Sequence, residues 1–537
     1  MRAAELFIRC LENEGVELLF GLPGEENIDL LDVLLDSSIR VIATRHEQGA
    51  AFMADVHGRL TGRAGVALST LGPGATNLVT GIADANMDRA PVVAIAGQAA
   101  TTRMHKESHQ HLDLVELFRP ITKYGTQVRE PEIVPEILRK AFKVAEAEKP
   151  GASFIDLPEN IARAEVEGLE PLTRQAAMAP VASGTKITQA AELLSNARSP
   201  LVMAGNGVIR ADATGDLVRF AETLNLPVTH TFMAKGVIPA SHPLSLGSVG
   251  LQARDYVDRA FDHTDLVVCV GYDMVEYPPE RWNRSRDLRI LHIDSNPAEV
   301  DSHYIVEAGL IGDVGEALRE LTERVEAKAG EPAKEVHEAV RRSLEDHAGD
   351  GAFPMKPQRI LWELRQALAP EDIVISDVGA HKLWVARQYP AERPNTCLIS
   401  NGFASMGIGV PGAIAAKLIH PERQVVTVTG DAGFLMNVQE LETAVREKAP
   451  MVVLIWNDSA YGLIEWHQRE HFGRTAFIDF TNPDFVGLAE SFGARGYRVE
   501  AADELAPVLR QALADDTVAV IDCPVDYSES LEDLAVE

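Results

Sequence analysis

The chain has 537 residues, of which 46% are hydrophobic and 24% are charged, a composition that is ordinary for a folded globular protein. This length predicts three or four domains, because a single hydrophobic core rarely serves more than about 250 residues. The formal net charge of −30 repels nucleic acid phosphates and anionic lipid headgroups, which excludes nucleic acids and membrane surfaces as expected partners.

Cysteine usage and the absence of long apolar runs indicate a cytoplasmic setting. Cys10, Cys269, Cys397 and Cys523 are widely spaced and cannot form a disulfide framework for a chain of this size. The segment 1–20 has the spacing of an amphipathic helix followed by a strand, without the apolar stretch or cleavage site of a signal peptide. No apolar run reaches the ~18 residues that a membrane span needs.

Short apolar or β-branched runs alternate with helical periodicity, which predicts parallel sheets covered by helices. The expected strands are Val66–Ser69, Val92–Ala96, Leu201–Ala204, Leu266–Val270, Val374–Ser376, Val425–Thr429 and Val452–Trp456. Polar stretches at Glu165–Ser183 and Glu331–Pro357 are interpreted as linkers. They predict three open α/β domains, at residues 1–165, 185–330 and 355–537, whose ligands bind at the carboxyl ends of the strands.

The first predicted domain contains two Gly/Pro loops and a glutamate at an expected helix start. The loops are Gly21–Gly24 and Thr70–Asn77, and each is by itself only a turn signal. Glu47 is followed by small residues that let a helix pack closely against a neighbour. By residue type alone, such a glutamate is more often a capping or solvent-facing carboxylate than a catalytic one.

A histidine-rich stretch follows, with four potential metal ligands at His105, His109, His111 and Asp113. It lies in a polar loop without supporting Cys or Glu spacing, so we interpret it as a loop covering an active site rather than a transition-metal site. His109 or His111 could reach a substrate carboxylate from there.

The middle domain contains only a weak sequence signal for ligand binding. The glycines of Gly205–Gly207 follow an expected strand but give only part of the dinucleotide-binding fingerprint. We interpret this domain as structural and leave open whether it keeps a nucleotide cleft.

Two aspartates follow two apolar strands of the last domain. Asp431 lies within Gly430–Gly433, and Asp458 lies within Asn457–Ala460. If the strands are neighbours, both carboxylates lie at one edge with oxygen ligands suited to Mg²⁺. The glycines let backbone amides approach an anion, and a helix expected from Asn437 onward adds a favourable dipole. Each aspartate alone is more often a turn residue, whereas the pair favours a metal site.

This spacing resembles the signature of thiamine-diphosphate-dependent enzymes, which is Gly-Asp-Gly followed, after a strand–helix–strand interval, by Asn-Asn. By this resemblance Asp431 and Asp458 bind Mg²⁺ through their side chains and Ala460 through its carbonyl, with Asp458 replacing the more usual Asn. Glu47 matches the glutamate that protonates the cofactor's aminopyrimidine ring. The cofactor contacts that the resemblance implies are Pro23, Gly24, Thr70, Pro73, Asn77, Val378, Gly379, His381, Ala404, Met406, Gly430, Asp431, Ala432, Gly433, Asp458, Tyr461, Gly462 and Leu463.

The resemblance covers nearly the whole chain and is closest to the acetolactate synthases, especially the catabolic, flavin-independent type. The segment Gly271–Tyr277 stands where FAD-binding relatives carry Arg-Phe-Asp-Asp-Arg, so FAD is not expected. The implied reaction is decarboxylation of pyruvate on thiamine diphosphate and addition of the hydroxyethyl unit to a second pyruvate, giving 2-acetolactate and CO₂.

The residues that choose the substrate are implied by the same resemblance. Gln110 matches an active-site glutamine, and His109 replaces a phenylalanine of the biosynthetic type. His467 stands where that type has a tryptophan favouring 2-oxobutyrate, with Trp466 one position earlier, so pyruvate is the expected acceptor. Glu47, Gln110 and His109 are the catalytic candidates.

In this family the glutamate and the diphosphate site of one active site come from different subunits, which implies a homodimer or homotetramer. Other thiamine-dependent activities remain as alternatives: a 2-oxo acid decarboxylase, a sulfoacetaldehyde acetyltransferase or a flavin-dependent pyruvate oxidase. A catalytically silent cofactor-binding subunit is a further alternative. The intact Glu47 and the Asp431–Asp458 pair disfavour this last interpretation.

Overall fold

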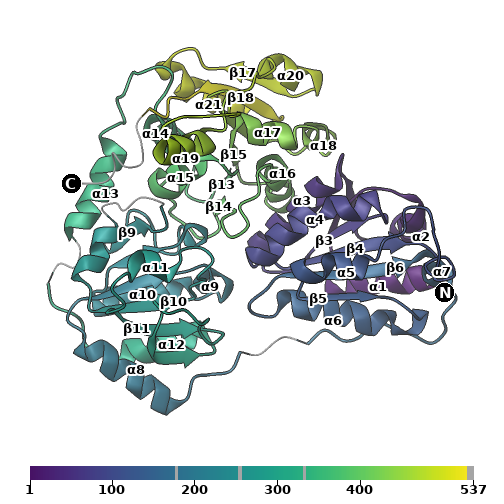
Figure 1. The fold of residues 1–537 in the computed structure, drawn as a ribbon, viewed down its shortest axis with the longest axis horizontal. Helices are drawn as coiled ribbons and strands as arrows, with labels where there is room; N and C mark the ends of the chain where they lie inside the picture. The colour runs from purple at the N-terminus through teal and green to yellow at the C-terminus, as the bar shows by residue number, and fades with distance from the viewer. Residues whose placement is uncertain (176–178, 252–256, 331–333, 529–537) are drawn as a thin grey trace.

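The structure is a computed structural model that describes residues 1–175, 179–251, 257–330 and 334–528. Across these residues the chain forms three parallel sheets of six strands each, flanked by helices, and this confirms the predicted fold class. The sheets follow one another along the chain and lie at the corners of a triangle (Figure 1). The expected linkers include residues 176–178 and 331–333, which lie outside the described residues. In the part that the structure describes, no helix is long and apolar enough to cross a membrane.

The first sheet has the strand order β2-β1-β3-β4-β6-β5. Its strands are β1 (Leu18–Gly21), β2 (Arg40–Ala43), β3 (Gly65–Ser69), β4 (Val92–Gln98), β5 (Tyr124–Gln127) and β6 (Ala152–Pro158). Its helices are α1 (Ala3–Glu14), α2 (Ile28–Leu34), α3 (Glu47–Thr61), α4 (Pro73–Met87), α5 (Leu114–Phe118), α6 (Val134–Glu146) and α7 (Glu159–Arg163). The central strands β3 and β4 are buried along their whole length, as their unbroken apolar sequences predict.

The second sheet has the order β12-β11-β10-β7-β8-β9, so its topology reverses between β7 and β10. Its strands are β7 (Pro200–Ala204), β8 (Val228–His230), β9 (Ser245–Ser248), β10 (Leu266–Val270), β11 (Arg289–Asp294) and β12 (Val306–Ile311). The helices are α8 (Gly184–Asn196), α9 (Gly207–Arg210), α10 (Thr214–Leu224), α11 (Pro279–Trp282), α12 (Val314–Arg324) and, towards the third sheet, α13 (Lys334–Glu345).

The third sheet has the order β14-β13-β15-β16-β18-β17. Its strands are β13 (Ile373–Ser376), β14 (Cys397–Ile399), β15 (Val425–Gly430), β16 (Val452–Asn457), β17 (Arg495–Arg498) and β18 (Ala519–Pro524). Its helices are α14 (Pro357–Ala367), α15 (Ala380–Gln388), α16 (Gly409–Ile419), α17 (Asp431–Met436), α18 (Glu440–Arg446), α19 (Gly462–Phe472), α20 (Phe485–Ser491) and α21 (Leu505–Ala514).

The structure confirms that β15 and β16 are parallel neighbours, with Gly430 opposite Trp456. The helix expected from Asn437 onward begins at Glu440 as α18, but it is not the helix whose N-terminus lies at the end of β15. Helix α17 already begins at Asp431, with Gly430 in extended conformation as its N-cap, and Asn437 ends it. An extended glycine followed by an acidic residue starts a helix at once, so the first turn lies directly at the end of β15.

The first and third domains share one apolar core. Helix α3 packs on α16 (Figure 1), and Phe52 and Val56 of α3 lie in the same buried cluster as Val410 and Ile414 of α16. A Cβ at Gly412 would lie 3.0 Å from Val56 Cγ2, so the two helices approach closely there. Burial of each such side chain stabilises the packing by about 2 kcal/mol, which fixes α3 against the last domain.

Candidate active site

Glu47 is the first residue of α3 and is 7% exposed. Its Oε2 accepts a 2.9 Å hydrogen bond from Nδ2 of Asn77 on α4. Beside Oε1 lies Gly74, where a Cβ would come within 3.2 Å, so a larger residue would crowd the carboxylate. The structure therefore brings together Glu47 and Asn77, which the sequence placed thirty residues apart.

The loops after β1 and β3 meet next to this carboxylate. A Cβ at Gly24 would lie 2.4 Å from Thr70 Cβ, and a Cβ at Gly74 would lie 2.9 Å from Thr70 Cγ2. Pro73 is the first residue of α4, where its missing N–H is tolerated, and Pro23 is exposed before Gly24. The predicted aminopyrimidine contacts of the first domain thus gather at one sheet edge, as expected for parallel strands.

Gln110 also reaches this edge. A Cβ at Gly72 would lie 2.8 Å from the Cβ and the carbonyl oxygen of Gln110, so the two loops touch. Gln110 has a φ of +56°, which few residues other than glycine adopt, and its side chain is exposed. His109 is exposed beside it on the same loop. The expected active-site glutamine is therefore adjacent to the loop that leads to Asn77.

Two further polar residues of this loop, His111 and Asp113, form hydrogen bonds within the first domain. His111 Nδ1 lies 3.1 Å from Gln98 Oε1, and the Asp113 carboxylate accepts the N–H of Glu116 and caps α5. The histidines of this loop do not form a metal-ligand cluster with one another in the described ranges. The group found there lies on α19 and consists of His467, Glu470 and His471, whose ligand atoms all lie within 4.8 Å of one another.

Asp431 and Asp458 lie at the carboxyl ends of the neighbouring strands β15 and β16. Asp431 Oδ1 accepts the N–H of Ala432 and its Oδ2 accepts the N–H of Ser459, both at 2.8 Å. Asp458 Oδ1 lies 3.4 Å from the N–H of Ala460. Burial, followed by the charge of Asp431, raises the pKa of Asp458 to about 7, and burial also raises the pKa of Asp431. Two carboxylates in this setting favour a cation between them.

His381 provides an independent indication of an anionic ligand. Its ring is 2% exposed, and Nε2 has no hydrogen-bond partner among the described residues. Burial lowers the pKa of His381 to about 3, so the ring is neutral. A Cβ at Gly430 would lie 3.4 Å from Nδ1 of this ring. A buried polar atom without a partner is costly, and a diphosphate oxygen would satisfy an N–H at Nε2.

Asp377, which sequence reasoning missed, connects these segments. It follows β13, and it accepts hydrogen bonds from the N–H of Val378 at 2.7 Å and of Gly407 at 2.8 Å. Burial raises the pKa of Asp377 to about 6. A Cβ at Gly433 would lie 3.1 Å from its Oδ2, so Val378, Gly433 and the turn before α16 converge on it. Its position directly after a buried strand is the signal that revealed Asp431, and it could have been used here.

Two other polar residues at the site were also missed. Asn482 Nδ2 donates to Asp431 Oδ2 at 2.7 Å, and its Oδ1 is buried without a partner in the described chain. Glu440 Oε1 accepts the N–H groups of Arg45 and His46 at 3.1 and 3.0 Å, just before Glu47. Both contacts depend on tertiary packing, and no local pattern predicts them.

The remaining predicted cofactor contacts lie around Asp458 and before α16. Tyr461 and Gly462 begin α19, and a Cβ at Gly462 would lie 2.6 Å from Asp458 Oδ2. Ala404 has a φ of +58°, and Met406 is half-buried two residues later. A cavity of about 660 Å³ opens beside the Mg²⁺ candidate. Its lining includes Ala380, Leu383, Trp384, Asp458, Leu463 and Trp466.

Comparisons with known proteins show to which family the chain belongs. The chain matches the models of the thiamine pyrophosphate enzymes for the N-terminal TPP binding domain over residues 1–117, the central domain over 187–321 and the C-terminal TPP binding domain over 377–523. It is 38% identical to the acetolactate synthase of Bacillus subtilis, an alignment that covers 99% of this chain and 94% of the relative. It is 36% identical to the catabolic acetolactate synthase of Raoultella terrigena, covering 98% and 95%. The chain belongs to the acetolactate synthase family of thiamine pyrophosphate enzymes.

Membership of this family confirms the predicted resemblance and the thiamine diphosphate cofactor. A probable acetolactate synthase large subunit of Methanocaldococcus jannaschii is also 36% identical, over 99% of this chain and 93% of the relative. The matched N-terminal domain contains Glu47 and Asn77, and the matched C-terminal domain contains Asp431 and Asp458. The two halves of the candidate site thus lie in the two domains that are named for binding the cofactor.

Proposed function

We propose that the chain decarboxylates pyruvate on thiamine diphosphate and joins the two-carbon unit to a second pyruvate, giving 2-acetolactate and CO₂. The observation that carries this proposal is the buried Glu47 carboxylate, hydrogen-bonded by Asn77 at the edge where the loops of the N-terminal TPP binding domain meet. The full-length likeness to acetolactate synthases supports this choice among thiamine-dependent reactions.

Thiamine diphosphate, when bound, supplies a carbon nucleophile that attacks a 2-oxo acid and accepts the electron pair released by decarboxylation. Glu47 would hold a proton at the aminopyrimidine ring and take it back during turnover. Asn77 keeps the carboxylate oriented for this exchange. His381 Nε2 and the amides of Gly430–Gly433 would bind the diphosphate, and the apolar wall around Leu383 and Trp384 would limit the access of water.

A magnesium ion belongs to this proposal. Its ligands would be the side chains of Asp431 and Asp458 and the carbonyl oxygen of Ala460. Two carboxylates, a carbonyl and diphosphate oxygens form the hard oxygen donor set that Mg²⁺ prefers. The hydrogen bond from the N–H of Ser459 to Asp431 holds the ends of β15 and β16 together, which supports a shared site.

FAD independence is part of the same proposal. At the topological switch point between β7 and β10, where open sheets bind nucleotides, a Cβ at Gly207 would lie 2.6 Å from Gly271 Cα. Lys149 from the first domain reaches into this region, with Nζ 2.7 Å from Asp273 Oδ1 and 3.5 Å from Asp294 Oδ2. A flavin dinucleotide would need to displace these ion pairs.

We also propose that the active enzyme is at least a homodimer with Glu47 and the metal pair of each site on different subunits. In the described chain, Glu47 is hydrogen-bonded within the first domain, and Asp431 is hydrogen-bonded within the third. Mixing inactive Glu47→Gln and Asp431→Asn subunits tests this arrangement. Hybrid dimers would hold one intact site, so activity should recover, whereas sites within single subunits would give none.

The reaction is tested by incubating the protein with pyruvate, Mg²⁺ and thiamine diphosphate and measuring acetolactate and acetaldehyde separately. Acetolactate as the main product is the expected result. Acetaldehyde or acetyl phosphate without acetolactate would favour a decarboxylase or an acetyltransferase. Adding 2-oxobutyrate tests the acceptor preference, and an absorbance spectrum without flavin bands is expected from the purified protein.

A further inference from the structure

A buried cluster of charged side chains joins the first domain to the loop that carries Ala404 and Met406. We call this cluster the loop anchor; it consists of Asp55 and Arg59 on α3, Asp84 on α4 and Asp88 at its end. Arg59 Nη2 lies 3.0 Å from Asp84 Oδ2 and 2.9 Å from Asp88 Oδ2, and Arg59 is also paired with Asp55. The three carboxylate side chains are 0% exposed, and Arg59 is 8% exposed.

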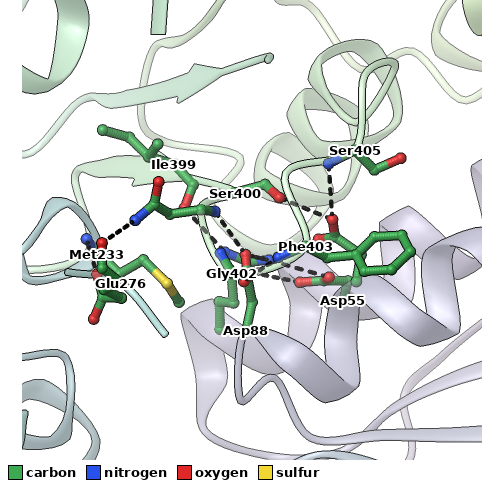
Figure 2. Close-up of polar contacts among 12 residues, drawn as sticks. Asp55, Asp88, Met233, Glu276, Ile399, Ser400, Gly402, Phe403 and Ser405 are labelled. Carbon is green, nitrogen blue, oxygen red and sulfur yellow. Dashed lines mark hydrogen bonds and ion pairs between the residues drawn. The ribbon is translucent and has the colours of Figure 1, made fainter. Parts of the chain in front are cut away.

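Asp88 holds the loop by its backbone. Its Oδ1 accepts the N–H of Gly402 at 2.6 Å and of Phe403 at 3.2 Å, and its Oδ2 accepts the N–H of Asn401 at 3.0 Å. Figure 2 shows the Asp88 carboxylate beneath this turn of the loop, with Gly402 and Phe403 directly above it. Three successive amides of the third domain therefore converge on one carboxylate of the first.

Asp84 continues the same contact towards the cofactor residues. Its Oδ1 accepts the N–H of Ser405 at 3.2 Å and the hydroxyl of Ser400 at 2.8 Å. Ala404, between the two anchored stretches, has its φ at +58°. This conformation costs about 1 kcal/mol for a residue with a Cβ and persists only where the surroundings impose it. The anchor supplies that constraint immediately before Met406.

Within the anchor three carboxylates face one guanidinium, and the buried ammonium of Lys382 adds a second positive charge close to Asp84 and Asp88. Burial, followed by the charges of Asp88 and Asp55, raises the pKa of Asp84. A buried ionic cluster of this kind is a poor source of stability, because apolar side chains of similar shape often do as well. Fixing the conformation of the loop gives the cluster a function that apolar side chains could not serve, since they cannot accept five hydrogen bonds.

We propose that Asp84 and Asp88 are positioning residues of the reaction, which hold residues 400–405 in the one conformation that presents Ala404 and Met406 to thiamine diphosphate. This inference rests on the proposed function. Helix α3 carries both Asp55 and Arg59 of the anchor and, at its first turn, Glu47. In the proposed dimer, where Glu47 acts with the metal pair of the other subunit, this one rigid element supports cofactor residues of both sites.

The test is Asp88→Asn, with thiamine diphosphate binding measured by calorimetry in the presence of Mg²⁺. An amide can accept at only one of its two ends, so at least one loop N–H loses its acceptor and the loop shifts. The dissociation constant for thiamine diphosphate should rise about tenfold or more, because a hydrogen bond to a charged group contributes at least that factor. The kcat should fall, whereas the KM for pyruvate should change little.

Glu14→Gln is the matched control. Glu14 is a buried carboxylate of the same domain, and it pairs with Arg139 on α6, away from the loop. This variant should lower the melting temperature while the dissociation constant for thiamine diphosphate stays at the wild-type value. The comparison separates positioning from general stability.

Gly402→Ala provides a second route if Asp88→Asn fails to fold. A Cβ there would lie 2.5 Å from Asp88 Oδ1, so the methyl group pushes the loop off the anchor without changing any charge. It should weaken cofactor binding in the same way. If either variant folds and binds thiamine diphosphate with wild-type affinity, the inference is wrong. A wild-type protein that does not bind thiamine diphosphate would instead overturn the proposed function.

Discussion

The side-chain amide of Asn77 on α4 donates a 2.9 Å hydrogen bond to Oε2 of Glu47, the first residue of α3. This neutral donor fixes the rotamer of the carboxylate without adding a charge beside it. Gly74 leaves room beside Oε1. This arrangement suits the acid–base role proposed for Glu47.

Glu47→Gln should lower kcat by about 10²–10⁴-fold, the usual effect of losing an acid–base group. Glutamine keeps an oxygen to accept the Asn77 hydrogen bond, so the affinity for thiamine diphosphate, measured by calorimetry, should stay close to wild type. Glu17→Gln, at an exposed loop position of the same domain, is the control and should retain full activity. A Glu47→Gln enzyme that runs at the wild-type rate would refute the role of Glu47.

The two aspartates of the proposed metal site should respond differently to substitution. Both oxygens of Asp431 accept hydrogen bonds, Oδ1 from the N–H of Ala432 and Oδ2 from Ser459 and Asn482. Asp431→Asn turns one of these acceptors into a donor that faces another donor, which displaces the proposed metal ligand and disturbs the loop after β16. Asp458→Asn keeps an oxygen ligand and leaves the single carboxylate that suffices for Mg²⁺. A titration of activity against Mg²⁺ should show a modestly raised requirement for Asp458→Asn and almost no activity for Asp431→Asn. Equal losses in both variants would argue against this assignment.

Lys149 should stabilise the packing of the first domain on the second. Its Nζ lies 2.7 Å from Asp273 Oδ1, and Arg210 lies 3.1 Å from Oδ2, so Lys149→Met leaves a buried carboxylate with half of its partners. Loss of one partner of a largely buried pair costs about 2 kcal/mol or more, and the melting temperature in calorimetry should fall by several degrees. Lys186→Met, exposed on α8, is the control. An unchanged melting temperature would contradict this role.

The sequence predicted what depends on local pattern. The run of apolar and β-branched residues predicted β10 with its observed bounds. The two aspartates that follow expected strands predicted that β15 and β16 end at the same edge of the sheet. The sequence did not predict the contacts of Glu440 or the loop anchor. A carboxylate that accepts hydrogen bonds from the amides of another domain leaves no periodic signal in its own segment. The start of α17 was missed because its first turn is formed by the same residues that end the strand.

Glu276, in the second domain near its contact with the third, offers a test of how stability depends on pH. It is buried, with Oε1 accepting the hydroxyl of Thr231 at 3.0 Å and Oε2 accepting the N–H of Met233 at 2.8 Å. Burial raises the pKa of Glu276 to about 8, with the charges of Asp273 and Asp88 adding to the effect. Its backbone carbonyl also accepts a 3.2 Å hydrogen bond from Nδ2 of Asn401, in the loop before Ala404.

The folded state therefore retains the Glu276 proton in a range where the unfolded chain has released it. The contribution of this proton to stability is fully present below the ordinary glutamate pKa of 4.5 and is lost as the pH rises to about 8. Glu276→Gln is permanently neutral and can still accept from Met233 and donate to Thr231. Its melting temperature relative to wild type should therefore rise steadily between pH 5 and pH 8, with the exposed Glu192→Gln as control. A difference that stays constant across this range would show that Glu276 is already ionised in the folded protein.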